Sequence, residues 1–278
     1  MSWVTLANKE IFLSSEQTHL GPADDLTVSL IQAPLQWQDA AANRLYFEQK
    51  IETIEACDLI LLPEMFNSGF SMNSEQIAEP FNGPTERWLR ALARRKNCAI
   101  AGSIATREAD RISNRLLFAS PEHCYHYDKK HLFRMADEHQ HYHPGSDRCI
   151  VLWRGWRLCL QICYDLRFPV FSRNRGDYDA LIYVANWPAK RRYHWRQLLI
   201  ARAIENQSCV LAVNRIGSDG NGLHYSGDSL ILAADGEVLA DATDREQLLT
   251  GTLQAAQLRD YRLSFPGHLD ADEFELNP

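Results

Sequence analysis

Three side chains able to take part in covalent chemistry each follow a predicted strand. Glu64 comes directly after the apolar run 58–63, Lys129 after the run 123–128, and Cys163 at the end of the run 157–163. A thiol attacks carbon poorly until a base takes its proton or a cation lowers its pKa. Because strand ends of one layer lie side by side, these three groups can meet in one site.

Together the three groups have the chemistry needed for cleaving an amide. The sulfur of Cys163 attacks the carbonyl carbon, and an ammonium plus a backbone N–H stabilise the charge that develops on oxygen. A carboxylate such as Glu64 takes the thiol proton, passes it to the departing nitrogen, and then activates the water that hydrolyses the thioester. A strand-end cysteine by itself more often only packs, so the prediction depends on the trio.

A second cluster, Asp137 to His143, alternates three histidines beside two carboxylates. Alternate residues of an extended chain share a face, which makes metal binding geometrically possible. However, the segment ends in Pro144-Gly145, and no second ligand motif occurs elsewhere. We therefore expect a solvent-facing loop and predict no metal site.

The elements that position these groups alternate along the chain. Amphipathic patterns predict helices over 40–56, 85–96 and 194–207, and apolar runs predict strands over 26–32, 58–63, 98–103, 115–119, 123–128, 157–163, 179–185 and 209–213. An Asp-Gly turn inside 229–240 predicts a hairpin. The β-α-β order indicates a layered α/β domain. The tail from Leu258 to Pro278 is charged and aromatic and shows no strong periodicity.

Composition limits the classes of partner. The 278 residues carry a net charge of −7, which argues against nucleic acid, and no run approaches the roughly 20 apolar residues of a membrane span. Seven scattered cysteines without a C-x-x-C pair favour a reducing cytoplasm over a disulfide framework. Residues 1–25 lack the features of a signal peptide, so we expect an N-terminal extension (1–25), one domain (26–265) and a short tail (266–278).

Three motifs resemble those of the nitrilase, or carbon–nitrogen hydrolase, superfamily. They are Leu-Leu-Pro-Glu64-Met-Phe, Tyr-Asp-Lys129-Lys-His-Leu-Phe and Ile-Cys163-Tyr-Asp-Leu-Arg-Phe-Pro, in the superfamily's order. The resemblance implies that Glu64 is the base, Lys129 the lysine and Cys163 the nucleophile. It also implies a second glutamate between lysine and cysteine, for which Glu138 is the candidate and Asp137 the adjacent competitor.

The same resemblance, which covers residues 26–265, sets expectations for the whole molecule. It implies an α/β fold arranged as a four-layer α-β-β-α sandwich, a homodimer or larger homo-oligomer, and no cofactor. The chain is most similar to the omega-amidase branch, which hydrolyses the terminal amide of 2-oxoglutaramate and 2-oxosuccinamate. The implied partner is therefore a small-molecule amide.

A substrate with a free carboxylate needs a cation near these motifs. Arg134, Arg167 and Arg191 are the candidates, although pairing with Asp165 or a buried glutamate is the favoured role of Arg167. Tyr164 and Trp187 are candidates for lining the substrate pocket.

Other functions remain open from the sequence. Deaminated glutathione or a carbamoyl amino acid is an alternative substrate, and a nitrile is a weaker one. A non-catalytic binding or scaffold module is the alternative of a different class.

Overall fold

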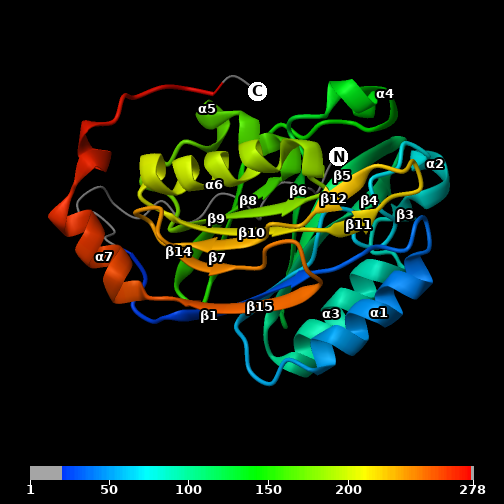
Figure 1. Ribbon diagram of the computed structural model, residues 1–278, viewed down its shortest axis with the longest axis horizontal. Coiled ribbons are helices and arrows are strands. Elements are labelled where there is room, and N and C mark those ends of the chain that lie inside the picture. Colours follow the sequence, from blue (N-terminus) through cyan, green and yellow to red (C-terminus); the bar gives the residue numbers. More distant parts are fainter. Residues whose placement is uncertain (1–20, 277–278) are drawn as a thin grey trace, which may run out of the picture.

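The computed structural model describes residues 21–276, so residues 1–20 of the expected N-terminal extension lie outside the described part of the chain. Two mixed β-sheets form the centre of the molecule (Figure 1). The first has the order β15-β1-β2-β4-β5-β6, with β3 beside β4, and the second has the order β14-β13-β10-β9-β8-β7. A small separate hairpin pairs β11 with β12.

The bounds of the strands follow the apolar runs of the sequence. The first sheet contains β1 (Leu26–Gln32), β2 (Leu59–Leu61), β3 (Glu79–Pro80), β4 (Ala99–Glu108), β5 (Arg111–Ala119), β6 (Cys124–Asp128) and β15 (Gln247–Leu253). The second contains β7 (Cys149–Trp153), β8 (Trp156–Ile162), β9 (Ala180–Ala185), β10 (Cys209–Asn214), β13 (Leu230–Leu232) and β14 (Val238–Asp241). The hairpin strands are β11 (Ile216–Ser218) and β12 (His224–Ser226).

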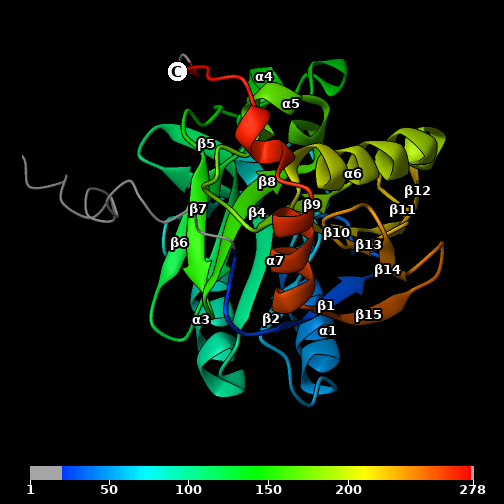
Figure 2. The ribbon, with the colours of Figure 1, turned by 90° about the vertical axis from the view of Figure 1, so that its left-hand side faces the viewer.

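Helices cover both outer faces of the paired sheets. The α-helices are α1 (Ala40–Glu52), α2 (Ser74–Ile77), α3 (Pro84–Lys96), α4 (Glu138–His141), α5 (Pro169–Ser172), α6 (Arg192–Asn206) and α7 (Ala255–Ser264). Short 3-10 turns are η1 (Arg134–Ala136), η2 (Cys163–Arg167), η3 (Ala189–Arg191) and η4 (Gly267–Asp270). In Figures 1 and 2, α1 and α3 lie against the first sheet and α6 against the second. This is the expected α-β-β-α sandwich.

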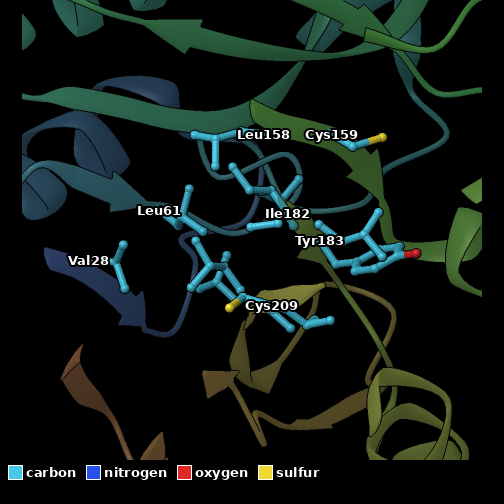
Figure 3. Packing of buried hydrophobic residues seen from close by; sticks show 14 of the residues in the cluster. Val28, Leu61, Leu158, Cys159, Ile182, Tyr183 and Cys209 are labelled. Carbon is cyan, nitrogen blue, oxygen red and sulfur yellow. The ribbon is translucent and has the colours of Figure 1, made fainter. Parts of the chain in front are cut away.

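The main core lies between the two sheets. Val28 and Leu61 of the first sheet face Leu158 and Ile182 of the second, and all four are fully buried (Figure 3). A second apolar cluster packs α1 and α3 onto the outer face of the first sheet. Strands buried on both faces explain why the sequence shows continuous apolar runs instead of alternation.

Several elements differ from the sequence expectation. β15 was not predicted, because it is largely exposed and its apolar residues are interrupted by Thr250 and Gly251. β7 was not predicted either, although it consists of five consecutive apolar residues. The tail beyond Leu258, where the sequence shows no strong periodicity, begins with the second half of α7, which extends to Ser264. That helix buries Ala255, Leu258 and Arg262, so a charged residue occupies a position where a periodicity analysis expects an apolar one.

The hairpin predicted over 229–240 is confirmed as β13 and β14, which pair antiparallel. Every helix that the structure describes is too short or too polar to cross a bilayer.

Candidate active site

Cys163 lies in a sharp turn at the end of a central strand. β8 ends at Ile162, and Cys163 opens η2 with a φ of 43°, a left-handed conformation that residues other than glycine rarely adopt. The turn leaves Cys163 8% exposed, with its sulfur in the wall of a cavity. Strain of this kind persists only where the surroundings hold the backbone in place.

Asp165 is the group that holds this turn. Its buried carboxylate accepts hydrogen bonds from the backbone N–H of Ile162 at 2.9 Å and from the hydroxyl of Tyr127 at 2.7 Å. The other oxygen accepts from the backbone N–H of His131 at 3.0 Å and lies 2.8 Å from its Nδ1. The His131 ring stacks on Phe168 with centroids 3.8 Å apart. Asp165 thus ties the cysteine turn to the segment that follows Lys129.

Lys129 lies between two buried carboxylates. Its Nζ is 2.8 Å from Oε1 of Glu64 and 3.0 and 2.9 Å from the two carboxylate oxygens of Glu138. All three side chains are at most 1% exposed. Lys129 follows the last residue of β6, Glu64 follows β2 by three residues, and Glu138 begins α4. The structure therefore brings both predicted glutamates to the lysine, and Asp137 is not among its partners.

The histidines beside Glu138 point elsewhere. His139, His141 and His143 are all exposed, whereas Glu138 is buried. The segment thus faces solvent, as the sequence predicted, while one of its carboxylates turns inward.

Two asparagines that sequence reasoning missed complete the floor of the site. Asn114 of β5 donates from Nδ2 to Glu64 Oε1 at 2.7 Å and lies 3.4 Å from Glu138 Oε1. The backbone N–H of Asn186 donates to Glu64 Oε2 at 2.8 Å, and its side-chain amide donates to the Glu64 carbonyl at 2.6 Å. Asn186 follows β9 directly, a strand-end signal that could have identified it; the position of Asn114 inside a strand offered no such signal.

Burial and neighbouring charges set the resting protonation of Cys163 and Lys129. Burial, together with the negative charge of Glu64, raises the pKa of Cys163 well above its ordinary value, and Lys129 offsets this only in part. Burial works to lower the pKa of Lys129, but Glu138 and Glu64 outweigh it and hold that pKa above its usual value. At neutral pH the resting site therefore contains a neutral thiol and a permanent ammonium.

A cavity of about 290 Å³ opens above these groups. Glu64, Lys129 and Cys163 form part of its lining. Aromatic and apolar side chains supply most of the rest, namely Phe70, Met72, Phe133, Tyr164, Trp187, Pro188, Leu223 and Tyr225. The predicted pocket residues Tyr164 and Trp187 are thus both placed in the cavity wall.

Two guanidinium groups also line this cavity. Arg167 lies over the ring of Trp187 at 4.8 Å and contacts His194 Nδ1 at 3.1 Å, and Arg191 lies over Phe133 at 5.2 Å. Within residues 21–276, neither forms an ion pair with a carboxylate. Burial and then repulsion from Arg167 lower the pKa of Arg191.

The sequence-based expectation that Arg167 pairs with Asp165 or a buried glutamate was therefore wrong. The Asp165 carboxylate is filled by Tyr127, His131 and Ile162, and no glutamate of the described residues pairs with Arg167. The guanidinium instead turns toward the cavity. The third candidate cation, Arg134, is exposed and does not line the cavity.

Comparison with known proteins agrees with this architecture. The carbon-nitrogen hydrolase family model matches residues 27–263. Omega-amidase YafV of Escherichia coli K12 is 49% identical over 253 residues, which cover 90% of this chain and 98% of that protein. The 2-oxoglutaramate amidase of Bacillus subtilis is 32% identical over 247 residues, 86% of this chain and 95% of that protein.

Among solved structures, XC1258 from Xanthomonas campestris superposes with a TM-score of 0.90 at 46% identity. The match covers 92% of this chain and all of that one, which is described as a CN-hydrolase superfamily protein with an arsenic adduct in the active site. The expected fold is thereby confirmed. The chain belongs to the carbon–nitrogen hydrolase family and is an amidohydrolase.

Proposed function

We propose that this enzyme hydrolyses the terminal amide of a small 2-oxo acid amide, such as 2-oxoglutaramate or 2-oxosuccinamate, to the acid and ammonia. The observation that carries the proposal is the pair of guanidinium groups, Arg167 and Arg191, in the same cavity as Cys163. Unpaired cations in an aromatic wall favour a ligand that brings its own carboxylate. A chain a few carbons long then places its far amide over the sulfur.

The reaction divides into two half-reactions that share one base. Glu64 removes the proton of Cys163 as the sulfur attacks the amide carbon, and Lys129 stabilises the resulting oxyanion. When the C–N bond breaks, Glu64 gives that proton to the leaving nitrogen, and ammonia departs from a thioester. Glu64 then takes a proton from water, the hydroxide displaces the sulfur, and the proton returns to the thiol. The role of Glu138 is to hold Lys129 in position and in its charged form.

Two features support this class of substrate over the alternatives. Omega-amidase YafV and 2-oxoglutaramate amidase, both similar over most of this chain, carry names for this chemistry. The cavity of about 290 Å³ also suits a five-carbon acid amide better than a tripeptide-sized molecule such as deaminated glutathione. A carbamoyl amino acid is small enough to fit and belongs in the same assay panel.

The decisive experiment measures ammonia release from anionic and neutral amides. Wild type, Arg191→Met and Lys190→Ala are assayed with 2-oxoglutaramate and with an uncharged amide of similar length. Loss of a charge-assisted contact of about 1.5–3 kcal/mol predicts a 10- to 100-fold lower kcat/KM for Arg191→Met with the anionic amide only. Lys190→Ala removes an exposed neighbouring charge outside the cavity, so it should leave the ratio between the two substrates unchanged.

Two results would contradict the proposal. One is equal loss on both substrates in Arg191→Met. The other is full activity of Cys163→Ala, which would remove the catalytic role and leave a binding module.

We further propose that the enzyme works as a homodimer in the cytoplasm. Its seven cysteines are all free, which suits a reducing compartment. Apolar side chains protrude from the outer helix layer, with Val170 58%, Tyr193 70% and Ile204 48% exposed. Light scattering during size-exclusion chromatography should give twice the mass of one chain, and a Tyr193→Glu variant should shift the protein toward the monomer. A wild type that elutes with the mass of one chain would contradict the assembly.

A further inference from the structure

Three side chains with different metal-binding atoms converge at the edge of the first sheet, outside the cavity. Glu86 projects from α3, and Cys124 and His126 project from β6. One ligand atom of each lies within 4.8 Å of the other two. Cys124 packs against the cluster between α3 and the first sheet, and none of the three residues lines the active-site cavity.

The contacts within this cluster already have the spacing of a coordination sphere. Glu86 Oε1 and His126 Nε2 are 3.2 Å apart, close to the roughly 3.3 Å that separates two ligands on one tetrahedral zinc ion. The Cys124 thiol donates to the backbone carbonyl oxygen of Tyr125 at 4.0 Å. One ligand atom from each of the three residues thus borders the space that a cation bound by all three groups would fill.

Burial distinguishes the cluster from chance surface neighbours. The Glu86 side chain is 3% exposed and that of His126 25% exposed, while Cys124 is half-buried. The cluster is thus closed on the carboxylate side and open toward solvent on the imidazole side. A thiolate, an imidazole and a carboxylate form the ligand set that Zn²⁺ and Co²⁺ prefer, whereas Mg²⁺ and Ca²⁺ prefer oxygen alone.

We propose that Glu86, Cys124 and His126 bind one thiophilic divalent cation of the zinc type, with water as the remaining ligand. Such an ion would join α3 to the edge strand β6. Lys129 follows β6 directly, so the ion would fix the strand whose end positions the active-site ammonium. The inference does not depend on the proposed substrate.

The test is a Co²⁺ titration followed by the sulfur-to-metal charge-transfer absorbance, with Zn²⁺ as competitor. All variants carry Cys163→Ala, so that the active-site thiol cannot contribute. Cys124→Ser and His126→Asn should each weaken binding at least about tenfold, because each removes one of three protein ligands. Cys57→Ser is the matched control, since Cys57 is another half-buried cysteine at the rim of the same apolar cluster.

The expected result is one equivalent of Co²⁺ per chain, a charge-transfer band that Zn²⁺ abolishes, and loss of both in Cys124→Ser but not in Cys57→Ser. Binding that survives in Cys124→Ser, or the absence of a band in the parent protein, would overturn the proposal. If Cys124→Ser fails to fold, His126→Asn answers the same question, because its side chain lies nearer the surface.

Discussion

At the scale of single residues, the proposed reaction depends on a thiol that stays protonated until substrate arrives. The raised pKa of Cys163 means that a preformed thiolate is not the resting species. In the proposed mechanism, nucleophilicity is therefore generated during attack, through the carboxylate of Glu64. This arrangement limits reaction of the sulfur with molecules that do not also engage the carboxylate.

A spectroscopic titration tests this state of the sulfur. The ultraviolet difference between wild type and Cys163→Ala should show no thiolate step between roughly pH 5 and 9, because the folded-state pKa lies above the ordinary value. Turnover should nevertheless be measurable within that range. A thiolate step near pH 6 would instead indicate an ion pair with Lys129 and contradict the base role of Glu64.

A second prediction at this scale concerns the buried side chain of Asn114. Its amide donates to Glu64, so Asn114→Ala removes a stabilising donor from the base. A hydrogen bond to a charged group contributes about 1.5–3 kcal/mol, so kcat/KM should fall 10- to 100-fold. As control, Asn43→Ala deletes another buried asparagine outside the cavity and should lower Tm with little change in kcat/KM. An unchanged kcat/KM in Asn114→Ala would mean that the asparagine only supports packing.

At the scale of elements, the β11–β12 hairpin forms one wall of the cavity. Asp219 holds its turn by accepting from the backbone N–H groups of Asn221 and Leu223, at 2.9 and 3.0 Å, and from the hydroxyl of Tyr225, at 2.9 Å. All four residues line the cavity. Residues 219–223 therefore form the turn of a hairpin that shapes the cavity.

This hairpin packs on Trp37 through Gly220. A Cβ at position 220 would lie 2.3 Å from Nε1 of the indole, so Gly220→Ala must push the turn or the ring away. Overpacking of this kind costs about 1–3 kcal/mol, and we expect KM to rise severalfold with a smaller change in kcat. Steady-state kinetics of Gly220→Ala alone and combined with Trp37→Leu provide the check. If the penalty persists unchanged without the indole, the proposed contact is not its cause.

At the scale of the whole molecule, a buried carboxylate joins the C-terminal helix to the second sheet. Asp179, just before β9, is 2.8 Å from Nη2 of Arg157 on β8 and 2.9 Å from Nη1 of Arg262 on α7. Burial works to raise the pKa of Asp179, but hydrogen bonds and charge from Arg157 and charge from Arg262 hold it below the usual value. Because the pKa of Asp179 is lower in the folded protein than in the unfolded chain, its ionised carboxylate stabilises the fold at pH values above the unfolded-state pKa.

The corresponding prediction concerns stability against pH. Asp179→Asn leaves buried guanidinium groups without a carboxylate and should lower the free energy of unfolding by about 3–5 kcal/mol at neutral pH. The difference in free energy of unfolding between wild type and Asp179→Asn should be at its maximum above about pH 4. It should shrink as the pH falls through the lower folded-state pKa of Asp179. Urea denaturation at several pH values measures this difference. Glu246→Gln, which breaks an exposed pair with Lys50, should cost less than about 1 kcal/mol. Equal costs for both variants would contradict this account of Asp179.

The sequence determined which polar groups directly follow the buried strands. Most of the candidate catalytic side chains are among these groups. Continuous apolar runs identify the central strands, and a polar residue just after such a run must lie at a sheet edge. Glu64, Lys129 and Cys163 could therefore be named in advance as candidates, whereas their roles, and Glu138 as a fourth residue, came from the family resemblance. The half-exposed strand β15 could not be identified in advance, because it pairs with β1 at the opposite end of the chain. β7 was overlooked although it is apolar and pairs with the adjacent strand β8.

Only the tertiary structure decided which cations face the cavity and which donor contacts the base. Arg167 and Asp165 are two residues apart, yet the turn at Cys163 sends the carboxylate inward to His131 and the guanidinium toward the cavity. Asn114 contacts Glu64 across 50 positions of sequence. Side-chain direction after a tight turn and contacts between distant segments depend on how the sheets pack, and local residue patterns do not encode that packing.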